Sequence, residues 1–470
     1  MKETLEREIK LAPGEGFVLP ELGGDRLPTR VFISTYHDTR DLRLARHGVT
    51  FRHRVEDGAG LWQLKLPRDA ARLELELAGP PARPPAELIA LLPAYLRGRD
   101  LVPVARLRTR REGIRTRGAE VVDDSVAVLE GQHVIRRFRE VEVELLEGDE
   151  RTLRQLEKEL RKAGATSTGL LQPKLYRALD LAGALEPRTS ERGTPPGEAL
   201  GIALEAEYLA LLAHDPGTRR GDDPEDLHQL RVATRRLRAF LRAARPLVEI
   251  DWATSLREEL GWLGGHLGPA RDLDVMLDRL RTEVEALDGD AEGARGLLEA
   301  LAEERAAAYV DVVEVLGGDR YFALLDRLEA AAMPPLTGDE TTLTAIFHRE
   351  SKRMRRTFAA LGNEPEDAAL HASRIAVKRA RYAADLASHE LGRPGERFVT
   401  VAKHMQDILG DHQDAVVAEG RIRDWAASAP TGGFAAGRLV QLERDRMAAA
   451  RAAWPETWQL LDQAARRAVR

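Results

Sequence analysis

The chain has 470 residues, which is too long for one compact core, so its length predicts two or three domains. It contains no cysteine, and this excludes disulfides, thiolate metal sites and cysteine nucleophiles. The formal net charge of −6 gives no indication of a nucleic-acid partner, and no apolar run is long enough to span a membrane. We therefore expect a cytoplasmic protein, since the first ten residues also lack the apolar core of a signal peptide.

Residues 1–184 are predicted to form an antiparallel β-sheet or barrel. Several segments alternate with the period of two that is typical of strands, among them ETLEREIK, VTFRHRVE, LWQLKLP, RLELEL, VARLRTRR and REVEVELLEG. The segment DERTLRQLEKELRKAG is predicted to be a helix that closes this region. Residues 185–197 collect Pro, Gly, Ser and charge, which indicates a linker.

Residues 198–470 change to a period of 3.6, which predicts an all-α helical bundle. The bundle contains an internal repeat, because LHQLRVATRRLRAFL from Leu227 matches LHASRIAVKRARYAA from Leu370 at an offset of 143 positions. A second pair, HLGPARDLDV from His266 and ILGDHQDAVV from Ile408, matches at an offset of 142. We infer a tandem duplication, with repeats at about 198–330 and 341–470 and approximate two-fold symmetry.

Charged side chains occupy alternate positions of the predicted strands and form an acidic and a basic set. The acidic set is Glu6, Glu8, Glu74, Glu76, Glu142 and Glu144, and the basic set is Lys10, Arg52, Arg54, Lys65, Arg106 and Arg108. A solvated outer face explains any one strand, but explains less well why one strand is all carboxylate and another all guanidinium. If these faces point into a barrel, only a polyanion with metal ions offsets the cost of burying them.

The two sets together predict a chain of phosphates as the ligand, held with divalent cations. Carboxylate oxygens suit Mg²⁺ or Mn²⁺, and the arginine fork suits phosphoryl oxygens. Hydrolysis would then use one ion to polarise the phosphate chain, while a second ion or a carboxylate activates water for in-line attack.

The segment EREIK resembles the ExExK signature of the CYTH superfamily, the triphosphate tunnel metalloenzymes. The segments STYHDTRDLRLARHGVTFRHR, WQLKLP, EVVDDSVAV and REVEVELLEG resemble later parts of the same family in the same order. The resemblance implies Glu6, Glu8 and Lys65 as catalytic residues. It implies as metal ligands Glu6, Glu8, Glu74, Asp123, Glu142 and Glu144. It implies as phosphate-binding residues Lys10, Arg52, Arg54, Lys65, Arg106, Arg108 and Lys174.

Each repeat of the second region carries a row of cations at helical spacing. The first row is His228, Arg231, Arg235, Arg238, Arg242 and Arg245, the second is His371, Arg374, Lys378 and Arg381, and a third is His348, Lys352 and Arg355. A solvated face balanced by acids on neighbouring helices remains the alternative, although few carboxylates interleave with these cations. The segments LHQLRVATRRLR and LGPARDLDV, with their second copies, resemble the CHAD domain, which implies binding of inorganic polyphosphate on the basic helix faces.

The sequence thus predicts an α+β multidomain protein, with an antiparallel β-barrel tunnel and flanking helices followed by an all-α bundle. The leading hypothesis is an inorganic triphosphatase that depends on Mg²⁺ or Mn²⁺ and binds polyphosphate through its helical domain. The alternatives are a polyphosphate-binding protein without catalysis, associated with polyphosphate granules, and an adenylate cyclase or thiamine triphosphatase. The last two need a pocket for a base, which the sequence does not identify. No nucleic-acid or membrane partner is expected.

Overall fold

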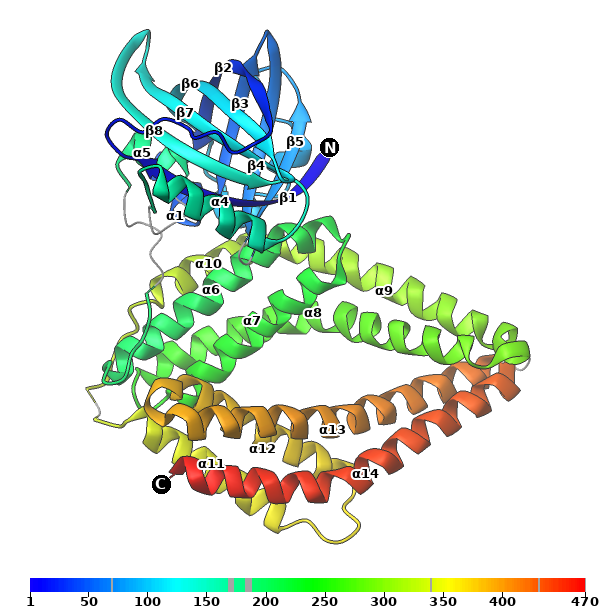
Figure 1. Cartoon of the computed structure of the whole chain (residues 1–470). Helices are drawn as coiled ribbons and strands as arrows, with labels where there is room; N and C mark the ends of the chain where they lie inside the picture. The colour runs from blue at the N-terminus through cyan, green and yellow to red at the C-terminus, as the bar shows by residue number, and fades with distance from the viewer. Residues whose placement is uncertain (69–70, 168–172, 182–187, 339, 430–431, 470) are drawn as a thin grey trace. The chain divides into compact units, whose positions relative to one another are not determined.

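The computed structural model describes residues 1–68, 71–167, 173–181, 188–338, 340–429 and 432–469. The chain divides into two compact units, Met1–Pro187 and Arg188–Arg470 (Figure 1). Residues 185–187 of the expected linker lie outside the described residues. None of the described helices is long and apolar enough to cross a membrane.

The first unit is a closed antiparallel β-barrel, as predicted. Its sheet has the strand order β5-β4-β3-β2-β6-β7-β8-β1-β9, and β5 also pairs with β1, which closes the first eight strands on themselves. The strands are β1 (Lys2–Pro13), β2 (Asp25–Asp38), β3 (Thr50–Glu56), β4 (Ala59–Arg68), β5 (Ala71–Ala78), β6 (Val102–Thr116), β7 (Ala119–Glu130), β8 (His133–Leu145) and β9 (Ala165–Ser167). The helices of this unit are α1 (Arg43–Arg46), α2 (Ala86–Ile89), α3 (Pro93–Leu96), α4 (Glu150–Lys162) and α5 (Lys174–Leu179).

A helix packed on the outside of the barrel decides which strand face is apolar. The predicted closing helix is α4, and its Leu156 and Leu160 are buried against Val141 and Val143 of β8. The helix begins at an N-cap, Asp149, whose side chain accepts hydrogen bonds from two backbone N–H groups of the first turn. Because alternate strand residues point to opposite faces, the residues between these valines point into the barrel and are free to be charged.

A second apolar cluster closes one part of the barrel interior. Leu175 and Tyr176 of α5 are buried with Tyr36, Leu107 and Val126 of the strands. Packing of α5 against β2, β6 and β7 brings the residue at its start, Lys174, to the barrel cavity.

The second unit is the predicted helical bundle with an internal two-fold repeat. Its first half comprises α6 (Pro196–Arg220), α7 (Pro224–Ala243), α8 (Ile250–Glu285), η1 (Asp288–Ala294), α9 (Arg295–Leu316) and α10 (Asp319–Ala330). Its second half comprises α11 (Leu343–Ala359), α12 (Asp367–Leu386), α13 (Ser388–Ser428) and α14 (Gly433–Val469). The duplicated segments make α7 equivalent to α12, and α8 equivalent to α13.

The two halves of the bundle meet at two places. The equivalent helices α7 and α12 pack against each other. At the far ends of the long helix pairs, Leu280 of α8 and Leu301 of α9 share a buried cluster with Ile422 of α13 and Leu439 of α14 (Figure 1). Contact between α7 and α12 brings their predicted rows of cations close together.

Candidate functional site

The barrel encloses a cavity of about 240 Å³ that is lined almost entirely by charged side chains. Opposite charges face each other across neighbouring strands, since Lys10 pairs with Glu142 and Lys65 with Glu74 in the strand register. The cavity includes most of the predicted tunnel residues, namely Glu6, Glu8, Lys10, Arg52, Arg54, Lys65, Glu74, Glu142, Glu144 and Lys174. The prediction that these faces point inward is therefore confirmed for these ten residues.

One part of the cavity carries more negative charge than its cations balance. The Lys65 Nζ donates to both carboxylate oxygens of Glu6 at 2.6 Å and lies 3.4 Å from Glu74 Oε1. The buried Glu8 Oε1 has no hydrogen-bond partner among the described residues, and Lys10 Nζ is 3.5 Å away. Burial, together with the nearby charges of Glu6, Glu74 and Glu8, raises the pKa of Glu144 to about 7.

This carboxylate cluster has the donor chemistry of a Mg²⁺ or Mn²⁺ site. Hard oxygen donors, a buried oxygen without a hydrogen bond to any described residue, and a carboxyl group whose pKa is raised by burial and by like charges all favour an added cation. As the described residues stand, no three acidic or histidine side chains are grouped to hold an ion, and Lys65 instead bridges Glu6 and Glu74. Metal binding would therefore require Lys65 to turn away from Glu6.

A second part of the cavity is a neutralised ionic network. Lys174 Nζ lies 2.9 Å from Asp124, 2.6 Å from Glu140 and 2.8 Å from Glu142. Arg111 donates two hydrogen bonds to Asp124, at 2.8 and 2.6 Å, and one to Glu142 at 2.9 Å. Burial by itself would raise the pKa of Glu142, but the charges of Lys10, Lys174 and Arg111 hold this pKa well below its usual range. Glu142, predicted as a metal ligand, is thus in the tunnel but is held by three cations.

Two partly buried arginines, Arg52 and Arg54, place positive charge in the cavity. The hydrogen bonds of Arg52 to described residues go to two neutral groups, Gln63 Oε1 at 2.8 Å and the Tyr36 hydroxyl at 3.1 Å. Arg54 donates to Glu56, and its burial and the charge of Arg52 lower its pKa to about 10. A bound polyanion would remove this repulsion between neighbouring guanidinium groups.

Three predicted tunnel residues lie outside the tunnel, and this corrects the sequence interpretation. Arg106 and Arg108 are exposed on the outer face of β6, whereas Arg111 lines the cavity. Asp123 pairs with Arg139 at 2.5 Å on the outer face of β7, and the fully buried carboxylate is its neighbour Asp124. Because a shift of one residue moves a strand side chain to the opposite face, the prediction placed the wrong set of alternate residues of β6 and β7 inside the barrel.

The inward positions of Asp124 and Glu140 follow from the phase of their strands. Asp123 has the same phase along β7 as Val121, which belongs to the apolar outer face packed by α4. Glu140 has the same phase along β8 as Glu142, and it is 2 % exposed. The run RLRTRRE places arginine in both phases of β6, so the sequence alone does not distinguish Arg111 from Arg110.

The cation rows of the two repeats meet in the helical unit. A cavity of about 360 Å³ is lined by His228, Arg231, Arg235, Arg271, Arg374 and Lys378. An adjoining cavity of about 300 Å³ is lined by Arg235, Arg238, Arg242, Arg257, Lys378 and Arg379. Arg235 and its equivalent Lys378 line both cavities, and we call the two cavities together the basic cleft.

The basic cleft concentrates positive charge beyond what its acids balance. Burial and the charges of Arg374, Arg235 and Arg381 lower the pKa of Lys378 to about 7. The first row is also constrained by its neighbours, since Arg231 donates to Asp272 at 2.7 Å and Arg271 donates to His228 Nδ1 at 3.0 Å.

Three of the predicted polyphosphate-binding residues do not line the cleft. His371 and Lys352 are exposed, and Arg381 lies 4.0 Å from Asp385 and over the ring of Tyr382. The prediction of a continuous row on each helix therefore holds for only part of the second row.

Comparison with known proteins identifies both units. A model of the CYTH domain matches residues 4–169, and a model of the CHAD domain matches residues 202–423. Two uncharacterized proteins of Mycobacterium tuberculosis strains, MT2285 and Rv2226, are each 30% identical over 99% of this chain and 98% of their own length.

Solved structures give weaker similarities. PptA from Streptomyces chartreusis is 25% identical, with 57% of this chain and 100% of that chain covered and a TM-score of 0.49. The CHAD domain from the plant Ricinus communis is 24% identical, with coverages of 59% and 94% and a TM-score of 0.48. The Hippeastrum protein HpAC1, a putative adenylyl cyclase described with a dominant triphosphatase activity, is 18% identical, with coverages of 38% and 96% and a TM-score of 0.25.

Proposed function

This chain belongs to the family that joins a CYTH domain to a CHAD domain, and on that premise we propose that its barrel is a metal-dependent inorganic triphosphatase. One observation carries the proposal: the same cavity holds a carboxylate cluster with unbalanced negative charge and two partly buried arginines that repel each other. A metal ion and a phosphate chain bound together would neutralise both.

The lining of the cavity favours a substrate without a base. Of the described residues that line it, only Tyr36 is aromatic, and its hydroxyl accepts a hydrogen bond from Arg52. An adenine or thiamine group would find no apolar surface there to replace its contacts with water. Inorganic triphosphate needs only charged and hydrogen-bonding groups, so we favour it over ATP and thiamine triphosphate.

The residues divide into metal-holding and phosphate-holding roles. Glu6, Glu74 and Glu144 would hold the divalent ion, with Glu8 beside it, and the ion would neutralise phosphate charge and lower the pKa of bound water. In the proposed reaction, Arg52 and Arg54 bind non-bridging phosphoryl oxygens and orient the chain.

Hydrolysis forms a bond between a water oxygen and the terminal phosphorus, breaks the bridging P–O bond and yields orthophosphate and pyrophosphate. Lys65 transfers its hydrogen bonds from Glu6 to the phosphate chain and so balances the charge on the leaving pyrophosphate. Glu8 Oε1, which has no hydrogen-bond partner among the described residues, is the oxygen we assign to accept the proton from water.

Phosphate release from inorganic triphosphate, ATP and thiamine triphosphate in the presence of Mg²⁺ or Mn²⁺ tests this proposal. We expect release mainly from inorganic triphosphate, lost on chelation, and reduced at least 100-fold by Glu6→Gln and Lys65→Ala. Glu147→Gln, an exposed carboxylate outside the cavity, is the matched control and should retain full activity. No metal-dependent release from any of the three substrates refutes the enzymatic proposal, and formation of cyclic AMP from ATP would assign the site to a cyclase.

A non-catalytic phosphate-binding protein is the second candidate. It is favoured by the bridge that Lys65 forms between Glu6 and Glu74, since this bridge occupies carboxylates that a metal would need. Saturable binding of triphosphate without release of phosphate at any metal concentration would select this candidate.

We propose further that the basic cleft of the helical unit binds inorganic polyphosphate, which would allow association with polyphosphate granules. The proposal is supported by Arg235 and Lys378, which line both cavities. Charge reversal at these two positions in the full chain should abolish the protection of Arg238 by polyphosphate against chemical modification of arginine, whereas Lys352→Glu, on an exposed residue outside the cleft, should not. Protection of Arg238 that persists in the double variant would show that the cleft is the wrong surface.

A further inference from the structure

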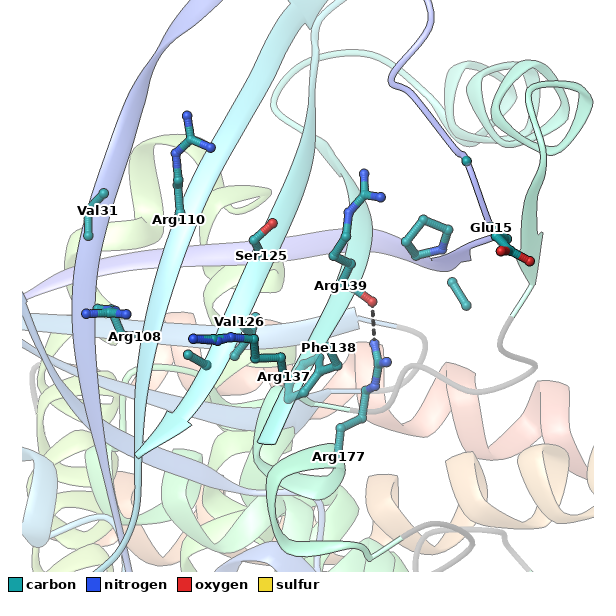
Figure 2. A pocket seen from close by; sticks show the side chains of 15 residues that line it. Glu15, Val31, Arg108, Arg110, Ser125, Val126, Arg137, Phe138, Arg139 and Arg177 are labelled. Atoms are coloured by element: carbon teal, nitrogen blue, oxygen red, sulfur yellow. Dashed lines mark hydrogen bonds between the residues drawn. The ribbon is translucent and has the colours of Figure 1, made fainter. Parts of the chain in front are cut away.

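A second basic groove lies on the outside of the barrel, away from the tunnel. Its cavity has a volume of about 880 Å³ and is walled by arginines from β6, β8 and α5 (Figure 2). We call it the outer groove, and its arginines are Arg108, Arg110, Arg137, Arg139 and Arg177. Arg108 was expected in the tunnel, and the structure places it in this groove instead.

The strand register sets the arginines in two parallel rows. Arg110, Ser125 and Arg139 are successive neighbours across β6, β7 and β8, as are Arg108, Ala127 and Arg137. Figure 2 shows Arg110, Ser125 and Arg139 side by side on their three strands. Since adjacent strands lie about 4.8 Å apart, the two rows of arginine are separated by about 10 Å. The small side chains of β7 therefore form the floor of a trough between two cationic walls.

The arginines of the walls are largely available to a ligand. Arg108 and Arg137 are exposed and have no hydrogen bond or ion pair with any described residue. Arg110 pairs with Glu112 at 2.6 Å and Arg139 with Asp123 at 2.5 Å, both at the surface, where such pairs contribute little and exchange readily.

The acids near the groove do not cancel its charge. The exposed Glu15 also lines it, and with Glu112, Asp123 and the buried Glu140 beside Arg177, four carboxylates lie near five guanidinium groups. Arg177 is held in place, because its NH1 donates to the Arg139 carbonyl at 2.9 Å and its guanidinium lies 4.2 Å from the ring centre of Phe138.

We propose that the outer groove binds a single extended chain of inorganic polyphosphate. The two rows of arginine are too close together to admit a nucleic-acid duplex between them, but a single chain can contact both. Of the described residues that line the groove, Phe138 is the only aromatic one, and Arg177 covers its ring. Single-stranded nucleic acids depend on exposed aromatic rings for base stacking, so the groove favours a phosphate chain without bases.

The outer groove is a binding site separate from the tunnel, and its occupation does not depend on hydrolysis there. Arg177 NH1 lies 3.5 Å from Glu140, which forms part of the tunnel network through Lys174. Because Arg177 and Lys174 belong to the same helix, a chain held in the groove would pass beside α5, and the groove would keep a long polymer next to the barrel while shorter chains occupy the tunnel.

Chemical modification of arginines in the full chain, read by mass spectrometry, tests the proposal at the site itself. Long-chain polyphosphate should protect Arg108 and Arg137 from phenylglyoxal at least tenfold, while inorganic triphosphate protects neither. The exposed Arg7 and Arg83, which do not line the groove, should react equally with and without polyphosphate. Absence of protection at saturating polyphosphate refutes the site, and stronger protection by a single-stranded RNA of equal charge refutes the choice of ligand.

A double variant separates this site from the tunnel and from the basic cleft. Arg108→Glu with Arg137→Glu should remove the protection of Arg110 by polyphosphate and leave triphosphate turnover and the protection of Arg235 unchanged. The matched control is Arg7→Glu with Arg83→Glu, which should preserve the protection of Arg110. Loss of protection at Arg110 in the control, or its persistence in the double variant, would overturn the proposal, whereas a failure of tunnel hydrolysis alone would bear only on the triphosphatase.

Discussion

Replacement of Glu144 by glutamine should stabilise the metal-free barrel at alkaline pH. The pKa of this carboxyl group is raised from 4.5 to about 7 by burial and by the charges of Glu6, Glu74 and Glu8. Between these two pH values the folded chain retains a proton that the unfolded chain has released, so the stability of the wild type falls as the pH rises from 4.5 to 7. Above pH 7 the folded chain bears the full free-energy cost of the buried charged carboxylate, which at 1.36 kcal/mol per pKa unit amounts to at most about 3 kcal/mol.

The glutamine variant has no charge to bury, so its stability should not decline over this pH range. Chelator-treated proteins can be compared by the urea dependence of hydrogen exchange in peptides from β8, which reports the barrel separately from the helical unit. We expect Glu144→Gln to exceed the wild type by about 1 to 3 kcal/mol at pH 8 and to equal it at pH 4.5. The exposed Glu147→Gln is the control and should match the wild type at both pH values.

Metal binding should show the opposite preference. Because Glu144 must lose its proton to bind an ion, affinity for Mn²⁺ in the wild type should rise about tenfold per pH unit below pH 7 and level off above it. Glu144→Gln should weaken binding and remove this dependence. Equal stability of variant and wild type at pH 8, together with unchanged metal affinity, would refute the carboxylate cluster as a site of unbalanced charge.

Two further outcomes test the corrected positions and the basic cleft. Asp124→Asn should destabilise the barrel by about 3 kcal/mol, because it leaves Lys174 facing fewer acids in a buried network. Asp123→Asn at the surface should cost less than about 1 kcal/mol. Equal losses of stability in the two variants, measured by urea-dependent hydrogen exchange, would contradict this assignment. Polyphosphate affinity, measured by fluorescence anisotropy, should fall as the pH rises through 7, since Lys378 is protonated only below about pH 7. The variant Lys378→Met should lose that pH dependence, and the control Lys352→Met should keep it. A pH response that survives in Lys378→Met would assign the response to another group.

Much of the tunnel could be predicted from residues 1–184 alone. In β1, Glu6, Glu8 and Lys10 share one face while Ile9 and Leu11 lie on the other, and in β8 Glu142 and Glu144 alternate with Val141 and Val143. The charged inward set of these strands therefore follows from the period of two. The duplicated segments likewise predict which helices of the second unit are equivalent, because a repeat preserves spacing along the chain.

The kinds of residue in the site follow from the sequence pattern, whereas the inward phase of β6 and β7 and the balance of charge depend on packing between distant segments. The pattern gives a period for each strand, but packing of α4 and α5 selects which phase is inside, and so Arg111 and Asp124 replace Arg108 and Asp123 in the tunnel. Contact between α7 and α12 joins two separate rows into one basic cleft at Arg235 and Lys378.

The raised pKa of Glu144 and the outer groove also depend on neighbours from several strands that are distant along the chain. These features arise from electrostatic and packing contacts between segments, whose energies depend on distances that only the folded chain defines.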